Sequence, residues 1–221
     1  MVQLAQRTGF TDSALIRLLG RLTDIDVRIS PQGTADQLSR WLGWTDAISL
    51  SAVLNGSGLP TTQSPRPSTG TEEAECIRVR TALGKAIAEN NAFTTDFSLY
   101  RQRYLLRQQA MQTRIGPLRA QLRTRLATRS PAMAKLAAMD AVMEQALGAK
   151  EHSLLASIPA LLEQHFKRVR KAGQAADATD PDAWLEAFRK DFQDLLRAEL
   201  DFRFQPIEGL LEALRMKRAT D

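Results

Sequence analysis

Few side chains in this sequence have the types and spacing that catalysis needs. The only two histidines, His152 and His165, are thirteen residues apart. On a common helix they would point about 220° apart, so they cannot bind one metal ion there. Neither belongs to an HExxH or ExxH motif, and the sequence contains no Walker A, GxGxxG or GxSxG motif. No recognisable catalytic or metal-binding motif is present.

The carboxylates and the single cysteine favour structural roles. Asp140 and Glu144 share a helix face at a spacing of four residues, an arrangement that usually forms a solvated face. Cys76 lies on an apolar helical stripe, which favours a small core residue over a nucleophile. A single cysteine forms no internal disulfide and is typical of a reducing compartment such as the cytoplasm. We therefore expect no enzymatic activity, no metal and no cofactor.

The most distinctive chemistry lies in a basic segment. Between Asp96 and Asp140 the sequence has no carboxylate but nine basic residues. The whole chain carries a net charge of +5, so the remaining residues sum to about −4. This segregation favours binding to an acidic surface, either within the chain or outside it. The nine residues are Arg101, Arg103, Arg107, Arg114, Arg119, Arg123, Arg125, Arg129 and Lys135.

Three interpretations of this basic segment remain open. Acidic helices at 140–163 and 180–201, with charge balances of −3 and −4, could neutralise it from within the chain. An acidic partner protein or a second copy could supply the same counter-charge. Alternatively, the Arg-rich helix expected over 97–129 could bind nucleic acid, with Tyr100 and Tyr104 as its stacking aromatics.

A helix-turn-helix motif is excluded by charge. The short helices expected over 34–54 have a suitable length, but residues 41–55 contain no Lys or Arg and do contain Asp46. A recognition helix without a cation is a poor match for the phosphate backbone.

The basic and aromatic residues together give a predicted partner-binding set. Arginine, tryptophan and tyrosine tend to dominate protein interfaces. Trp41 and Trp44 bracket Leu42-Gly43, which fits a small core or an exposed docking patch, and we favour the core. The predicted partner-binding residues are Arg103, Arg107, Arg114, Arg119, Arg123, Tyr100, Tyr104, Trp41 and Trp44.

The elements that position these residues are all predicted to be helices. The chain is 43% hydrophobic but only 6% aromatic, a balance that favours helices over strands. Apolar residues recur every three or four positions, most clearly in the long segment that carries the arginines. We therefore predict an all-α fold, an elongated bundle of long antiparallel helices with a small N-terminal helical module. The long stripe consists of Phe97, Tyr100, Tyr104, Met111, Ile115, Leu118, Leu122 and Leu126.

Proline and glycine predict the boundaries. The segment 56–71 is rich in Gly, Ser, Thr and Pro, and it is predicted to be a flexible linker between a helical module at 1–55 and a bundle at 72–221. Ser130-Pro131 is a cap followed by proline at the first helical position.

Three further prolines are expected to interrupt helices. Gly116-Pro117 should kink or divide the arginine-bearing helix, and Pro206 should interrupt a later one. Pro159 should bend its helix or mark its start. No stretch of the sequence approaches the roughly 20 apolar residues of a membrane span, and no signal-peptide pattern begins the chain. We expect a cytoplasmic protein.

Three segments together resemble an uncharacterised family of mostly proteobacterial proteins, known as a domain of unknown function. They are TGFTDSALIRLLGRLTDIDV with RWLGWTDAISLSAVLNG, YRQRYLLRQQAMQTRIGPLRAQLRTRLA, and LLRAELDFRFQPIEGLLEALR. Such families are often encoded beside membrane proteins of the motor or OmpA-like type. The resemblance therefore implies a cytoplasmic companion of an envelope-linked assembly, with a membrane-associated protein as a partner.

These observations predict a non-catalytic protein–protein interaction protein: an adaptor, scaffold or accessory subunit that binds a protein partner or a second copy. Nucleic-acid binding by the Arg-rich helix is the alternative.

Overall fold

The computed structural model describes residues 13–23, 41–56, 69–89, 94–175 and 182–216. Within these ranges the fold is helical and contains no strand, which confirms the predicted all-α class. The helices in chain order are α1 (Ala14–Thr23), α3 (Trp44–Asn55), α4 (Thr69–Ala88), α5 (Phe97–Ala127), α6 (Pro131–Ala156), α7 (Ile158–Ala175) and α8 (Ala183–Met216).

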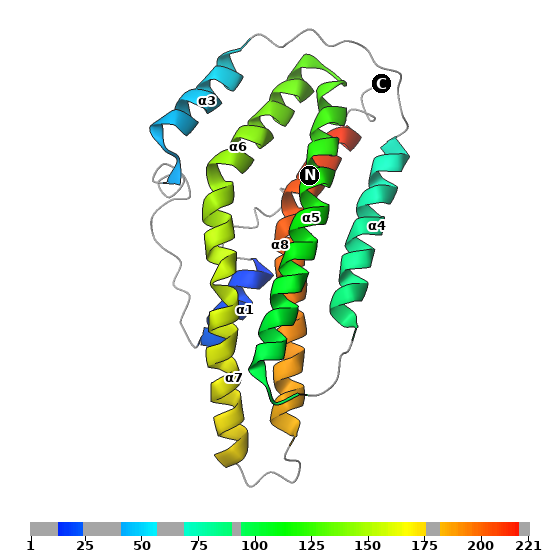
Figure 1. The fold of residues 1–221 in the computed structure, drawn as a ribbon. Coiled ribbons are helices and arrows are strands. Elements are labelled where there is room, and N and C mark those ends of the chain that lie inside the picture. Colours follow the sequence, from blue (N-terminus) through cyan, green and yellow to red (C-terminus); the bar gives the residue numbers. More distant parts are fainter. Residues whose placement is uncertain (1–12, 24–40, 57–68, 90–93, 176–181, 217–221) are drawn as a thin grey trace, which may run out of the picture.

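The long helices form an elongated bundle around a central pair. Figure 1 shows α5 and α8 running side by side in the same direction, with α4 along one side and α6 followed by α7 along the other. The flanking helices run in the opposite direction to the central pair. The short helix α3 lies on the outer side of α6 (Figure 1). The bundle is therefore mostly antiparallel, with one parallel pair at its centre.

Helix α8 forms the middle of the core. Fifteen of its 34 residues are buried, and it contacts α1, α4, α5 and α7. At one end, aromatic rings from three helices interlock at this core. The Phe166 ring of α7 lies 4.8 Å from the Phe188 ring of α8 in an edge-on arrangement, and Tyr100 of α5 lies 5.0 Å from the same ring. Edge-to-face rings add to the free energy of apolar burial.

The predicted stripe on α5 faces this core. Every residue of that stripe after Phe97 is buried, and Phe97 is half-buried against the same cluster. The helix begins at a side-chain cap, because the Asp96 carboxylate accepts a hydrogen bond from the backbone N–H of Ser98 at 2.9 Å. Ser130 caps α6 in the same way, with Pro131 at the first helical position. These local signals were sufficient to place the helix starts.

The predicted interruption at Pro206 is wrong, and Pro117 does not divide its helix. Pro117 lies inside the continuous helix α5, and Pro206 lies inside the continuous helix α8. Pro117 is exposed, so water can reach the carbonyl group that the missing N–H leaves unbonded. Buried residues on both sides of each proline keep the helix axis against its neighbours. Pro159, by contrast, is the second residue of α7 and marks its start, as expected.

The division into a helical module at 1–55 and a bundle at 72–221 stays a prediction. The two described helices of residues 1–55, α1 and α3, pack on the bundle. Leu15 and Leu22 of α1 belong to the same core as α8. Helix α3 contacts α6. The helix predicted after Thr34 lies almost entirely outside the described residues. Helix α4 begins at Thr69, slightly before the predicted end of the linker, and residues 57–68 lie outside the described ranges.

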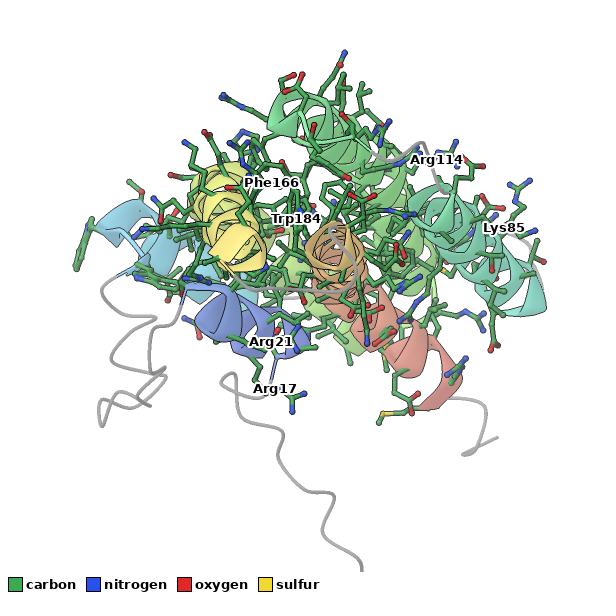
Figure 2. The ribbon with its side chains drawn as sticks, turned by 90° about the horizontal axis from the view of Figure 1, so that it is seen from below. Arg17, Arg21, Lys85, Arg114, Phe166 and Trp184 are labelled. Carbon is green, nitrogen blue, oxygen red and sulfur yellow. The ribbon has the colours of Figure 1, made fainter. Side chains whose placement is uncertain are left out.

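A close approach joins the end of α7 to the start of α8. A Cβ atom placed on Gly173 would lie 2.7 Å from the Trp184 Cβ atom, nearer than any side chain tolerates. Figure 2 shows Trp184 beside Phe166, and their ring centroids are 5.5 Å apart. Position 173 therefore requires glycine, because any side chain there would overlap Trp184.

Candidate functional site

Two of the five arginines predicted to contact a partner are neutralised inside the chain. Arg119 makes a two-pronged contact with Asp140, at 2.9 Å from Nε and 2.6 Å from a terminal nitrogen. Arg123 binds the same carboxylate at 3.1 Å and also pairs with Glu144. Both arginines are mostly buried between α5 and α6. Internal neutralisation, one of the three interpretations, therefore applies to this half of the basic segment.

The other three arginines lie on the flank of α5 toward α4. Arg107 pairs with Glu89 at 3.7 Å. The Arg103 guanidinium lies 5.9 Å from the centroid of the Tyr100 ring. Arg114 is exposed, and Figure 2 shows it with Lys85 on the side of the molecule that α4 and α5 form. Of the five arginines predicted to contact a partner, these three are the ones that Asp140 and Glu144 do not neutralise.

Tyr100 and Tyr104 are core residues and not surface anchors. Tyr100 is 3% exposed and Tyr104 is fully buried, so neither ring can stack on a base or fill a partner's pocket in this structure. Their spacing places them on the apolar stripe, and α8 covers that stripe with Phe188 and Phe192.

Tyr104 belongs to a buried polar network between α5 and α8. Its hydroxyl donates a hydrogen bond of 2.7 Å to Glu199, a carboxylate with no exposed surface. The Gln108 amide donates to both oxygens of Glu199 at 3.1 Å and to the Leu155 carbonyl at 3.0 Å. Arg203 donates to the same carboxylate at 2.9 Å. A buried carboxylate with three donor side chains is fully satisfied.

The sequence prediction missed this network, although a signal was present. Gln108 fills the one seven-residue gap in the apolar stripe of α5, between Tyr104 and Met111. Glu199 follows Phe192 and Leu195 at the same kind of spacing on α8. Polar residues at two core positions of two helices are expected to face each other, because a buried polar group needs a partner.

A small pocket opens beside Tyr100, where α4, α5 and α8 meet. Its volume is about 40 Å³. The Tyr100 hydroxyl has no hydrogen-bond partner among the described residues. Burial raises the pKa of this hydroxyl, while the nearby Arg189 and Arg103 charges oppose the rise. The polar lining residues are Glu89, Tyr100, Arg103, Arg107, Arg189 and Gln193.

A second polar contact joins α1 to α7 and α8. Nε2 of His165 lies 2.9 Å from a carboxylate oxygen of Asp191, and an Arg168 nitrogen lies 3.2 Å from Nδ1 of the same ring. Since a guanidinium only donates, Nδ1 must accept and Nε2 must carry the proton. Arg168 also donates to the Leu22 carbonyl, and Arg21 of α1 pairs with Asp191 at 2.9 Å. These contacts hold α1 on the bundle.

Helix α3 presents an apolar face to solvent. Trp44 is 81% exposed and Ile48 is 53% exposed, while none of the α3 residues is buried. The opposite face, with Leu50 and Val53 half-buried, is the one directed at α6. The helix starts at Trp44 because the Asp46 carboxylate accepts from the Gly43 N–H at 2.9 Å. Trp44 is therefore a surface residue.

Trp41 is also partly exposed, at 42%, and the Lys150 ammonium of α6 lies 5.7 Å from the centroid of its ring. Of the two alternatives for the tryptophan pair, the exposed patch describes these positions better than a small core does.

An open groove runs between α4 and α8. Cys76, Phe204 and Ile207 contribute to its apolar lining. Its charged rim is paired: Arg80 bonds to Asp201 at 2.7 Å and to Glu208, and Arg215 bonds to Glu73. Burial, and then the Glu75 charge, raises the pKa of the Cys76 thiol to about 11. This thiol is therefore protonated at neutral pH and a weak nucleophile.

The chemistry of the described residues includes no assembled metal site. No group of three His, Cys, Asp or Glu residues is placed to hold a metal ion within the described ranges. His152 is exposed and His165 is buried beside Asp191. None of the described helices is both long and apolar enough to cross a membrane.

The fold and its polar contacts define an all-α bundle protein with a satisfied buried carboxylate network and an apolar helix on its outside. Residues 1–216 match the family described as protein of unknown function (DUF3348), and the chain belongs to this family. The expected membership of an uncharacterised domain family is therefore confirmed. Comparison with curated proteins and with solved structures gave no match.

Proposed function

We propose that this protein is a non-catalytic protein–protein interaction protein, an adaptor, scaffold or accessory subunit, and that it binds through the outer face of α3. The observation that carries the proposal is the 81% exposure of Trp44 on a helix whose other face already lies on α6. Large aromatic residues rarely stay this exposed without a partner, and tryptophan is the commonest interface anchor.

The occupant that best fits this face is the same face of a second copy. Asp46 is the one charged residue of α3 and it caps the helix start, so few like-charged side chains would face each other when two copies meet here. The large residues Trp44 and Ile48 precede the small residues Ser51 and Ala52. A two-fold antiparallel pairing centred on Ile48 would place Trp44 of each copy over Ala52 of the other.

The alternative, nucleic-acid binding by the helix over 97–129, has less support. Arg119 and Arg123 are held by Asp140 and Glu144, and Arg125 lies 3.3 Å from Glu72. A cation already paired with a carboxylate releases few counterions when it meets a phosphate. We also propose a cytoplasmic location, as a companion of an envelope-associated assembly in a proteobacterium. The single cysteine and the family resemblance support that placement.

The test is the mass of the protein in solution, measured by light scattering during size exclusion at low and high salt. The expected result is a dimer that persists at high salt, because apolar burial is weakly screened. Trp44→Glu should give a monomer with an unchanged circular dichroism spectrum. The matched control is Leu154→Glu, which adds the same charge at a leucine of α6 that is 61% exposed and should leave the dimer intact.

Other outcomes would overturn parts of the proposal. A monomer at every concentration and both salts would reject self-association through α3. A dimer that both substitutions leave intact would place the interface elsewhere. Absorbance at 260 nm that is removed only by high salt would favour the nucleic-acid alternative.

A further inference from the structure

We propose that the pocket beside Tyr100 is a binding site for a phosphate group. This inference is independent of the α3 face, because the pocket is bounded by α4, α5 and α8, whereas α3 packs on α6. It rests on three features of the pocket: its charge, an unsatisfied hydroxyl and its size.

The charge of the pocket is positive. Arg107 faces Glu89 at 3.7 Å, and Arg189 pairs with Glu186 at 2.9 Å. Arg103 has no carboxylate partner among the described residues, and its guanidinium lies over the Tyr100 ring. Arg103 therefore adds a positive charge to the pocket that no described carboxylate neutralises, and an anion is favoured beside it.

The Tyr100 hydroxyl needs an acceptor. It is buried, it belongs to a residue that lines the pocket, and it has no hydrogen-bond partner in the described ranges. The Thr94 backbone is near enough to oppose the rise in pKa but does not reach hydrogen-bond geometry. Burial keeps the hydroxyl protonated at neutral pH, so it can donate. A buried donor without an acceptor is costly, and an anionic oxygen would remove that cost.

The size of the pocket selects a small group. A volume of about 40 Å³ corresponds to roughly three water-sized probes. A phosphate group fits this space, whereas a nucleobase or a sugar does not. The guanidinium groups of the lining arginines come from two helices, α5 and α8, and the Tyr100 hydroxyl adds a further donor. Donors in this arrangement can bind the several oxygens of a tetrahedral phosphate better than they can bind a planar carboxylate. The pocket is open on one side, so either free phosphate or the terminal phosphate of a small metabolite could enter.

The test is the thermal unfolding of the full chain in increasing inorganic phosphate, with chloride at matched ionic strength as the reference and ³¹P line broadening as a direct measure of binding. Glycerol phosphate and acetate are tested in the same way as two further ligands. Phosphate should raise the midpoint of thermal unfolding more than chloride or acetate does. Equal binding of glycerol phosphate would identify a phosphorylated metabolite as the source, and binding of inorganic phosphate alone would identify the free ion.

Two variants and one control locate the site. Tyr100→Phe should leave the unliganded protein equally or more stable, since it removes an unsatisfied hydroxyl, yet it should weaken phosphate binding. Arg103→Gln should weaken binding by roughly tenfold or more, the effect of a lost charged hydrogen bond. Arg114→Gln removes the same charge from the same helix outside the pocket and should bind phosphate as the natural chain does.

The proposal is overturned if phosphate acts no differently from chloride, or if acetate stabilises as strongly as phosphate. It is also overturned if Arg114→Gln weakens binding as much as Arg103→Gln, because the effect would then come from net charge alone.

Discussion

Tyr104 and Glu199 are 95 positions apart in the chain, and they meet through a hydrogen bond of 2.7 Å with no exposed surface on either residue. Gln108 and Arg203 complete the set of donors around the carboxylate. Sliding α5 along α8 by one turn would separate the carboxylate from Tyr104 and Gln108. A buried charge without donors is strongly unfavourable, so this contact fixes the register of the two central helices.

Replacing Tyr104 with Phe should lower the free energy of unfolding by roughly 1.5–3 kcal/mol, the value of a buried hydrogen bond to a charged group. Burial and the Glu199 charge both raise the pKa of Tyr104, so the hydroxyl stays a donor across the neutral range and the loss should not depend on pH there. Urea unfolding followed by circular dichroism measures the change. Tyr100→Phe is the matched control, and an equal loss in both variants would contradict this account.

The contact between Arg119 and Asp140 should stabilise the fold measurably. In a double-mutant cycle with Arg119→Gln and Asp140→Asn, we expect a coupling free energy of about 1–3 kcal/mol, because the pair is bidentate and mostly buried. The exposed pair of Lys167 and Glu163 on α7 should give a much smaller coupling. Similar couplings for the two pairs would show that burial adds nothing to the first.

Cys76 should resist alkylation in the folded protein. Its pKa of about 11 lies above the ordinary value, so at pH 8 only about one thiol in a thousand is ionised, against a quarter for a thiol of ordinary pKa. The rate of alkylation by iodoacetamide, followed by mass spectrometry, should be at least about a hundredfold lower in the folded protein than in the protein unfolded in urea. In the folded protein this rate should rise about tenfold per pH unit up to about pH 10. A rate that levels off near pH 8 would refute the raised pKa.

Replacing Gly173 with Ala should destabilise the fold by roughly 1–3 kcal/mol, the cost of overpacking, because the new methyl group meets the Trp184 Cβ atom. Gly148→Ala is the control, since a Cβ there meets nothing within 4 Å inside α6. That substitution should stabilise the protein by about 0.5–1 kcal/mol. The two midpoints of thermal unfolding should therefore move in opposite directions. A shift of the same sign would show that the end of α7 and the start of α8 move apart to accommodate the new methyl group.

The sequence was most informative where structure depends on local chemistry. The apolar stripe from Tyr100 to Leu126 is buried as predicted, and Asp96 and Ser130 cap the helices that their side chains favour. The prediction failed at Pro206, and Pro117 does not divide α5, because packing along two long helices outweighs the lost hydrogen bond of each proline.

The candidate sites depend on contacts between distant parts of the chain, which local patterns do not reveal. The charge of the basic segment predicted binding, but only the fold distinguishes Arg123, held by Glu144, from Arg103 at the pocket. Tyr100 was expected on the surface, and its burial follows from the stripe on which it lies. The Tyr100 hydroxyl that supports the phosphate site has no hydrogen-bond partner among the described residues, and this follows from the packing of three helices together.

The central place of α8 has a consequence during protein synthesis. Ribosomes produce α1, α4, α5 and α7 before the helix on which all four pack. Until α8 emerges, the apolar stripe of α5 lacks its contacts with Phe188 and Phe192, and the hydroxyl of Tyr104 lacks Glu199, so the nascent helices cannot bury their faces in the native way. The bundle is therefore expected to become stable only after α8 has emerged, and chaperones that cover apolar helices would act on the chain up to that point.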